Sequence, residues 1–308
     1  MKFALGMPAL ILYPPVMSPW EPQATGADIV RIAQTADELG FDWLTVSEHI
    51  IIPDEMAEVM GRRFPEALSA AAFLAGATKR IRVLPYVLVL PYRNPLLLAK
   101  QIATLDFVCG GRFTLGTGAG HIEKEFEVLD VPFGERGTRT DEYLLAMKEL
   151  WTSPAPSFHG RYVNFDKIAF EPKPVQRPHP PIFIGGNSRP AMRRAANFGD
   201  GWAPWLVTRE QLPERLSYLR EQPGLRDHPR PFEIVMPLAT FQIEDYSHRI
   251  LGETRQPHER EAIVEEIALL DQAGATVLVI NPPRTQSVEQ LIDWLRWFAG
   301  EVMPACGR

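Results

Sequence analysis

The chain has 308 residues, of which 45% are hydrophobic and 23% are charged. This length can bury a large core, and (β/α) barrels commonly have this size as one domain. The formal net charge of -6 argues against a nucleic-acid partner, because binding to a phosphate backbone normally needs a clustered basic face. We therefore expect a small-molecule ligand.

Strand and helix patterns alternate along the whole chain, which predicts parallel strands covered by helices. The predicted strands are Lys2–Met7, Asp42–Val46, Arg82–Leu88, Arg112–Thr117, Pro181–Ile184, Gly201–Ala203, Phe232–Met236 and Thr276–Ile280. Eight strands with helices between them close most simply as a barrel. The predicted fold is an α/β (β/α)8 TIM barrel, with residues 1–308 as a single domain.

Helical spacing of apolar residues marks the segments between strands. The helix after the first strand carries Ile32 and Ala36 on one face and is predicted to end at Gly40. A later helix carries Ile267 and is predicted to end before Gly274. Glycine suits both positions because it readily adopts the left-handed conformation that ends many helices.

Two stretches interrupt the alternation. Residues 154–181 contain seven prolines around the hairpin-like FHGRYVNFD, so we expect an insertion on the surface. Residues 236–258 lack clear periodicity, and long loops inside a compact domain are usually lids or binding loops. We expect a second insertion there, near the active-site mouth.

The two cysteines, Cys109 and Cys306, form neither a disulfide framework nor a metal-ligand spacing, so we expect no metal site and a cytoplasmic protein. The uncharged stretch from Phe3 to Trp20 contains four prolines and no cleavage pattern, which argues against a signal peptide. No other segment has the ~18 apolar residues that a membrane span needs.

His49 closes the second predicted strand in WLTVSEHIIIP. The carboxyl ends of barrel strands carry the chemistry, and an imidazole there can donate or accept a proton near neutral pH. The alternative is a histidine that only bonds a neighbouring carbonyl.

Gly116, Gly118 and Gly120 end the fourth predicted strand as G-x-G-x-G, which differs from the dinucleotide fingerprint G-x-G-x-x-G. Such glycines let the backbone approach a flat ring closely. His121 follows directly, and a catalytic role and a packing or ring-contact role are both open for it.

Gly185, Gly186, Asn187 and Ser188 follow the fifth predicted strand, with Ser188 as a helix N-cap. Backbone N–H groups at a helix start bind anions, so this turn suits a flavin-type phosphate. The nearby Arg189, Arg193 and Arg194 either add positive charge to this anion site or form a solvated helix face.

Acidic residues gather just after His121. We interpret Glu123, Glu125 and Glu127 as ordinary surface charges, together with the mixed charges that follow near Glu142.

Four segments carry a family resemblance: LPYRNP, LLLAKQIATLD, GGRFTLGTGAG and GGNSRPAMRRAANFGDGW. The sequences of these segments and their order along the chain resemble the bacterial luciferase-like superfamily, most closely its members that use the deazaflavin coenzyme F420. The resemblance implies a luciferase-like barrel enzyme that transfers a hydride between a deazaflavin and an organic substrate.

The resemblance also implies roles for individual residues. Glu48 and His49 stand where these relatives carry Asp-His beside the reactive ring, and both are candidate catalytic residues. His121 stands where many relatives have Trp and one branch has a catalytic Glu. Tyr86 and Val87 match a bulge that backs the cofactor ring, which predicts a non-prolyl cis peptide between them.

Two other functions stay open. One is an FMN-dependent two-component monooxygenase of the same superfamily, and the other is a non-catalytic flavin-binding protein. The expected partners are a small-molecule substrate and a second copy of the chain in a homodimer, with neither nucleic acid nor membrane.

Overall fold

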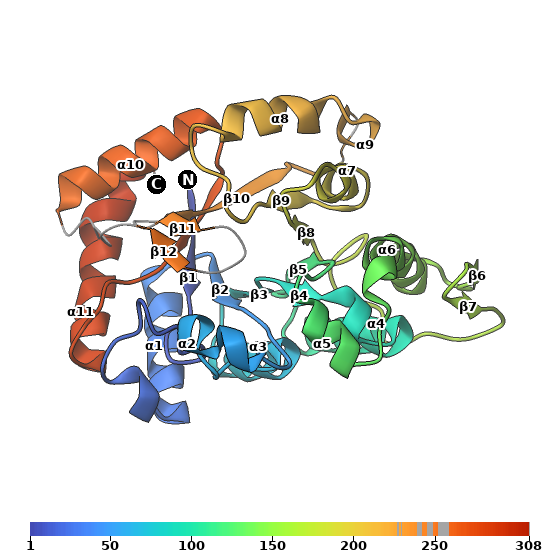
Figure 1. Cartoon of the computed structure of the whole chain (residues 1–308), viewed down its shortest axis with the longest axis horizontal. Coiled ribbons are helices and arrows are strands. Elements are labelled where there is room, and N and C mark those ends of the chain that lie inside the picture. Colours follow the sequence, from blue (N-terminus) through green and yellow to red (C-terminus); the bar gives the residue numbers. More distant parts are fainter. Residues whose placement is uncertain (227, 229, 239–241, 245–248, 252–258, 308) are drawn as a thin grey trace.

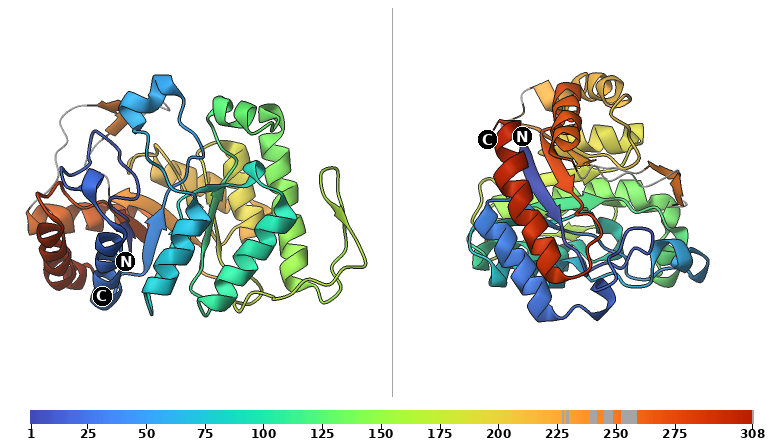
Figure 2. Two further views of the ribbon diagram at one scale, coloured as in Figure 1. Left: turned by 90° about the horizontal axis from the view of Figure 1, so that it is seen from below. Right: turned by 90° about the vertical axis from the view of Figure 1, so that its left-hand side faces the viewer.

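The computed structural model describes residues 1–226, 228, 230–238, 242–244, 249–251 and 259–307. Helices surround a sheet of parallel strands (Figure 1, Figure 2). In space the strands follow the order β3-β2-β1-β13-β10-β9-β8-β5-β4. Their bounds are β1 (Lys2–Gly6), β2 (Trp43–Val46), β3 (Arg82–Pro85), β4 (Leu88–Val89), β5 (Leu115–Gly118), β8 (Ile182–Gly185), β9 (Gly201–Ala203), β10 (Glu233–Leu238) and β13 (Val277–Ile280).

The sheet closes through the third predicted strand, which is divided into β3 and β4. β3 pairs with β2, and its Val83 also forms a parallel bridge with Phe113, just before β5. β4 pairs with β5. Because β3 and β4 make one interrupted strand, the described strands form an eight-stranded barrel, and the predicted TIM-barrel fold is confirmed. The peptide bond between Tyr86 and Val87, in the gap between β3 and β4, is cis as predicted.

The helix boundaries follow local sequence signals. Gly40 (φ 83°) and Gly274 (φ 106°) end α1 and α10 in the left-handed conformation, as predicted. At the start of α4 the Asn94 side chain accepts hydrogen bonds from two backbone N–H groups, and Pro95 takes the first helical position. The helices are α1 (Gly26–Leu39), α2 (Ala57–Met60), α3 (Ala67–Ala77), α4 (Pro95–Val108), α5 (Glu123–Val128), α6 (Arg136–Thr152), α7 (Arg189–Phe198), α8 (Leu212–Arg220), α9 (Pro223–Arg226), α10 (Arg260–Ala273) and α11 (Val288–Trp297).

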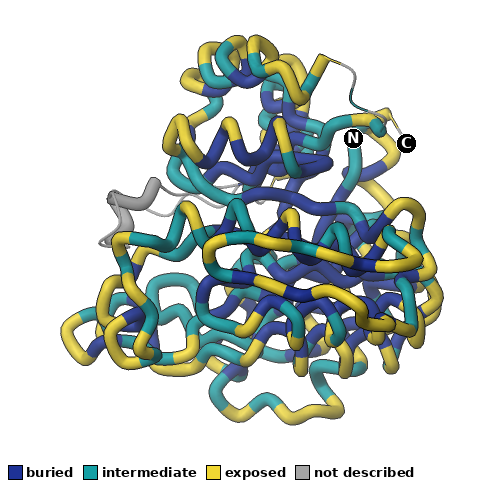
Figure 3. The backbone as a smooth tube through the Cα atoms, turned by 90° about the vertical axis from the view of Figure 1, so that its right-hand side faces the viewer, coloured by how far each residue is buried: buried dark blue, intermediate teal, exposed yellow. Residues whose placement is uncertain are grey.

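Two apolar clusters pack on either side of the strands. The inner cluster includes Trp43 and Phe183, whose ring centroids are 6.0 Å apart. The Trp43 indole N–H donates to the buried Thr114 hydroxyl at 3.0 Å, so its polar atom is also satisfied. The larger outer cluster joins strands to helices and contains the fully buried Trp202. Figure 3 shows these buried stretches inside and the exposed ones on the outside.

The segments of the two expected insertions each contain an antiparallel strand pair, and the barrel strand β10 reaches Leu238, inside the second segment. Residues 154–181 contain the antiparallel pair β6 (Phe158–His159) and β7 (Asn164–Phe165), which projects beside α6 (Figure 1). The Glu142 carboxylate of α6 accepts three backbone N–H groups of residues 161–163, so it anchors this hairpin. Residues 236–258 include the short antiparallel strands β11 (Gln242–Glu244) and β12 (Arg249–Leu251), and most of the remainder lies outside the described residues.

Gly116 of β5 lies too close to β3 to carry a side chain. A methyl group there would lie 1.9 Å from the Pro85 carbonyl oxygen. We predict that Gly116→Ala lowers the free energy of unfolding by about 1–3 kcal/mol or more, because backbone must move to admit the methyl group. In the control Gly76→Ala, on the exposed face of α3, the methyl group meets no atom within 4 Å. That change should stabilise by about 0.5–1 kcal/mol. Denaturant unfolding measures the free energy of unfolding of both variants. Similar small changes in the two variants would contradict the close approach of Gly116 to Pro85.

Candidate functional site

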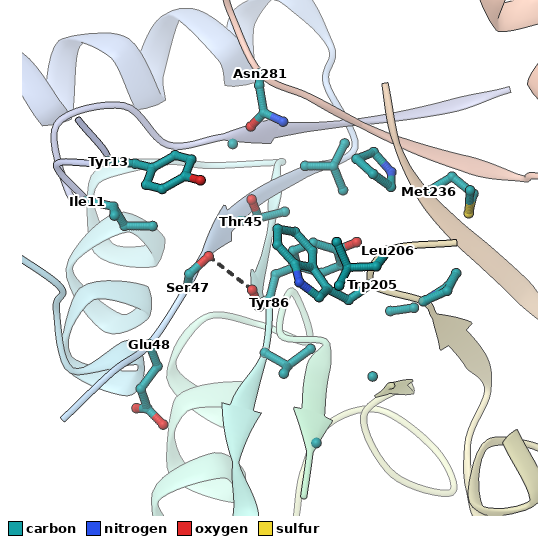
Figure 4. Close-up of a pocket in the computed structure, with 18 of the residues that line it drawn as sticks. Ile11, Tyr13, Thr45, Ser47, Glu48, Tyr86, Trp205, Leu206, Met236 and Asn281 are labelled. Atoms are coloured by element: carbon teal, nitrogen blue, oxygen red, sulfur yellow. Dashed lines mark hydrogen bonds between the residues drawn. The ribbon is translucent and has the colours of Figure 1, made fainter. Parts of the chain in front are cut away.

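A cavity of about 1240 Å³ opens at the carboxyl ends of the barrel strands. Ligand pockets are commonly about 300–1,000 Å³, so this one has room for a cofactor and a substrate together. Figure 4 shows part of it. The structure brings all the candidate residues to its lining: Glu48, His49, Tyr86, Val87, Gly118, Gly120, His121, Gly185, Gly186, Asn187 and Ser188.

Val87 and two glycines form a flat part of the cavity wall. A methyl group at Gly118 would lie 3.2 Å from one Val87 methyl carbon, and one at Gly185 would lie 3.0 Å from the other. The wall therefore consists of backbone and a single small side chain. Because neither glycine has a side chain, a ligand can approach the backbone closely at these two positions, beside the Val87 methyl groups.

The turn after β8 begins α7 at the edge of the same cavity. The Ser188 hydroxyl caps the helix by accepting the Ala191 N–H at 3.3 Å. The Asn187 side-chain oxygen accepts the Trp205 N–H at 2.7 Å, which ties the turn to the loop after β9. Gly186 has a φ of 115°. The expectation that this turn lies at a helix N-terminus facing the barrel mouth is confirmed, and N–H groups at such a position suit an anion.

Two arginines line the cavity beside this turn, Arg136 of α6 and Arg194 of α7. Arg194 is only 5% exposed, so its interpretation as part of a solvated helix face is wrong. Its guanidinium pairs with Asp141 at 2.5 Å and donates to the Gly137 carbonyl at 3.0 Å. Residues of α6 therefore fix the Arg194 guanidinium, and the carboxylate of Asp141 compensates its charge.

His49 lies between a buried carboxylate and the cavity. Its Nδ1 is 2.8 Å from Glu125 Oε2. Its ring meets the Phe64 ring edge-on at 4.7 Å between centroids, and the exposed His121 ring lies 6.0 Å away. Because Glu125 occupies Nδ1, Nε2 is the ring nitrogen left to a ligand in the cavity, where an imidazole can donate or accept a proton.

Glu125 is fully buried, so its interpretation as an ordinary surface charge is wrong. Its Oε1 accepts the backbone N–H groups of Ile50 and Ile51 at 2.8 and 3.3 Å, and its Oε2 accepts the Tyr92 hydroxyl at 3.0 Å. Burial by itself raises the pKa of Glu125. Hydrogen bonds from His49 and the two N–H groups, with the charge of His49, outweigh burial and hold this pKa below its usual value. The ionised carboxylate thus fixes both the imidazole and the loop after β2.

Glu48 points away from the centre of the cavity (Figure 4) and is only 3% exposed. Its two oxygens pair with the Arg93 guanidinium at 2.9 and 2.5 Å and accept the N–H groups of Ala67 and Val89, each at 3.2 Å. The carboxylate next to His49 in sequence is therefore engaged elsewhere. Glu125, on α5 just after β5, is the carboxylate that contacts the imidazole.

Sequence reasoning missed the roles of Glu125, Tyr92 and Arg93. Tyr92 and Arg93 lie inside the LPYRNP segment, just before α4, so that segment already placed them near a strand end. Glu125 follows His121 by four residues in an acidic run that looks like a solvated helix face. Only its partners distinguish it from the exposed Glu123 on the same helix.

The family model described as luciferase-like monooxygenase matches residues 7–273. The chain belongs to this family. Its members are oxidoreductases and monooxygenases that act on small molecules, which makes this luciferase-like protein an enzyme of that superfamily.

Curated relatives agree with this family. An uncharacterised protein of Mycobacterium tuberculosis is 33% identical over 231 residues, covering 70% of this chain and 78% of the relative. An FMNH(2)-dependent dimethylsulfone monooxygenase of Pseudomonas putida is 30% identical over 217 residues, covering 68% of this chain and 58% of the relative.

Solved structures share the barrel. The monooxygenase RslO1 from Streptomyces bottropensis superposes with a TM-score of 0.75 at 23% identity, over 99% of each chain. An F420-dependent secondary alcohol dehydrogenase in complex with an F420-acetone adduct gives a TM-score of 0.74 at 21% identity, over 100% of each chain. At these identities the structures are evidence for the fold alone.

Among the described residues of this luciferase-like protein, no helix is long and apolar enough to cross a membrane. The same residues contain no group of three or more His, Cys, Asp or Glu side chains that could hold a metal ion. The expected homodimer stays a prediction.

Replacing the buried Glu125 carboxylate should reveal its electrostatic role. We predict that Glu125→Gln lowers the free energy of unfolding by about 1.5–3 kcal/mol at pH 7, because bonds to a charged acceptor are lost. The pKa of this carboxyl is lower in the folded state than in the unfolded state. Its contribution is therefore complete above the ordinary Glu pKa and is lost as the pH falls through the folded value, so the difference between variant and parent should shrink below about pH 4.5.

Glu123→Gln is the matched control, because this exposed glutamate lies in the same turn of α5 and should change stability by less than about 0.5 kcal/mol. Denaturant unfolding at a series of pH values measures both variants. A Glu125→Gln cost that does not vary with pH would contradict an ionised carboxylate at this position.

Proposed function

We propose that this luciferase-like protein is an F420-dependent oxidoreductase that transfers a hydride between the deazaflavin and an organic substrate. The observation that carries the proposal is the imidazole of His49, held through Nδ1 by a buried glutamate at the mouth of a cavity with a glycine wall. Hydride transfer to or from an organic substrate requires a proton to move as well, and an oriented imidazole can supply or accept it.

Residues of the cavity have distinct proposed roles. Val87, Gly118 and Gly185 provide the flat wall against the cofactor ring, with Tyr86 and Gly120 beside them. His49 would exchange a proton with the substrate through Nε2, while Glu125 fixes its orientation. For Glu48, whose oxygens bind Arg93 and backbone, we propose that it positions the loop after β2 rather than moving a proton.

The other end of the cavity suits the cofactor's phosphate. Gly186, Asn187 and Ser188 present the N-terminus of α7. In its first turn the Ala191 N–H is capped by Ser188 and Pro190 has no N–H, so the Arg189 N–H is the one without a partner inside the helix. Arg136 adds positive charge beside it, while Arg194 is paired with Asp141. When bound, the deazaflavin supplies the hydride chemistry, and the protein supplies orientation, exclusion of water and proton handling.

An FMN-dependent monooxygenase is the second candidate function. The relative that supports it is the FMNH(2)-dependent dimethylsulfone monooxygenase, at 30% identity. The same wall and helix start would serve FMN equally well, so the cofactor decides the reaction class.

Cofactor choice is directly measurable. We predict that the apo-protein binds F420 more tightly than FMN in a fluorescence titration, because the segments SEH, LPYRNP and GGNS most closely resemble those of F420-dependent members of the superfamily. FMN binding at least tenfold tighter, a difference of about 1.4 kcal/mol, would instead favour the monooxygenase. Binding of either cofactor without turnover on any substrate would favour a non-catalytic flavin-binding protein.

His49→Ala tests the proton role. Turnover should fall by roughly 10²–10⁴, while the affinity for the cofactor changes little, because the imidazole faces the substrate rather than the phosphate turn. His159→Ala is the control, since this exposed histidine of β6 lies in the projecting hairpin. Steady-state kinetics and cofactor titration measure both, and unchanged turnover in His49→Ala would remove its catalytic role.

A further inference from the structure

One side of the cavity is built from apolar side chains of two loops, residues 7–21 and 51–64. Figure 4 shows Ile11 on this side, across the cavity from Trp205. We call this part of the lining the apolar chamber, and its apolar members are Met7, Ile11, Val16, Met17, Met60 and Phe64.

The two loops that form the apolar chamber are fixed to each other. The Leu12 N–H donates to the Arg63 carbonyl at 3.2 Å, and the Arg63 guanidinium donates to the Pro22 carbonyl at 3.1 Å. At Gly61 the loops touch so closely that a methyl group would lie 1.8 Å from the Leu12 carbonyl oxygen. The chamber is thus a built wall of the cavity in the free protein.

The apolar chamber directly adjoins the proposed proton donor. The Phe64 ring meets the His49 ring edge-on, with 4.7 Å between centroids. A molecule held against Phe64 would therefore lie within reach of the imidazole. This places the chamber where the substrate of the proposed reaction has to bind.

Charge is distributed unevenly between the two ends of the cavity. Among the described residues that line it, the arginines are Arg136, Arg194 and Arg209, which come from α6, α7 and the loop after β9. Arg194 pairs with Asp141, and Arg209 pairs with two further lining residues, Glu210 and Glu266. The lining residues of the two chamber loops include neither lysine nor arginine. The Glu21 carboxylate, at the chamber's edge, is only 8% exposed and accepts the N–H groups of Ala9 and Ser18.

Neutral polar groups are present near the chamber instead. The Tyr13 phenol and the Asn281 amide both line the cavity, and Figure 4 shows them at the same end. Burial raises the pKa of Tyr13 to about 12, so its hydroxyl stays protonated at neutral pH and can donate a hydrogen bond.

We propose that the apolar chamber selects a neutral, largely apolar organic substrate over a carboxylate, sulfonate or phosphate. An anion buried there would lose its hydration without gaining a lysine or arginine partner from the two chamber loops, whereas apolar surface is stabilised by leaving water. Thioether and aromatic side chains adapt well to flat or irregular apolar shapes, so ring compounds fit this wall. The inference depends on the proposed function only in treating this cavity as the substrate site.

A matched pair of probes tests the proposal. 2-Naphthalenemethanol is neutral and 2-naphthoate is anionic, and they share the same ring system. Equilibrium dialysis against the full chain at pH 8, above the ordinary histidine pKa of about 6.5, should show the alcohol binding at least tenfold tighter. Equal or tighter binding of naphthoate would overturn the proposal.

A charge placed in the chamber locates the binding. Ile11→Lys should reduce or reverse the tenfold preference, while Ile11→Leu, similar in volume and still neutral, should keep it. Val16→Lys is a second position in case Ile11→Lys does not fold. An unchanged preference in a folded lysine variant would mean that the probes bind elsewhere, which also overturns the proposal.

The outcome is separable from that of the proposed function, because the assay needs neither cofactor nor turnover. Tighter FMN binding would refute the F420 assignment and leave the chamber's preference standing. A loss of the preference would leave the cofactor titration untouched.

Discussion

The barrel depends on one close approach between neighbouring strands. β5 has no side chain at Gly116, where the Pro85 carbonyl oxygen would lie 1.9 Å from a methyl group. This contact lets the interrupted third strand, β3 followed by β4, pair on both sides and close the ring. Gly118 and Gly185 also lack a side chain where they line the cavity. A methyl group at either position would meet the side chain of Val87. Barrel closure and the flat cavity wall thus have one physical cause, the absence of Cβ atoms along the inner strand ends.

Two buried glutamates, Glu48 and Glu125, hold the loop after β2 through different contacts. Glu48 binds Arg93 and two backbone N–H groups, and Glu125 binds His49, Tyr92 and two further N–H groups. Buried carboxylates are costly unless every oxygen is satisfied, and these two meet that condition. Their positions hold the imidazole between a carboxylate and the cavity, which is the arrangement that proton exchange with a substrate requires.

The cavity has two chemically different ends. Arginines and the N-terminus of α7 make one end suitable for an anion, whereas thioether, aliphatic and aromatic side chains make the other end apolar. The phosphate of a deazaflavin or FMN would therefore bind at the first end, and an uncharged substrate would bind at the apolar end. His49 lies beside the apolar end, next to Phe64, so proton exchange is proposed where the substrate rather than the phosphate would bind.

The sequence by itself determined where the strands occur along the chain, which glycines end two of the helices, and which turn caps α7. Periodicity and capping are local properties of the chain. It also placed His49 and the Gly-rich segments at strand ends, and therefore at one face of the barrel. It did not reveal that Glu125 is buried, since an acidic run on a short helix has the same pattern whether it faces water or a partner. His49 and Glu125 are 76 positions apart in the sequence, and no local pattern relates residues at that separation. Only the closed barrel, which brings the ends of β2 and β5 together, decided which carboxylate holds the imidazole.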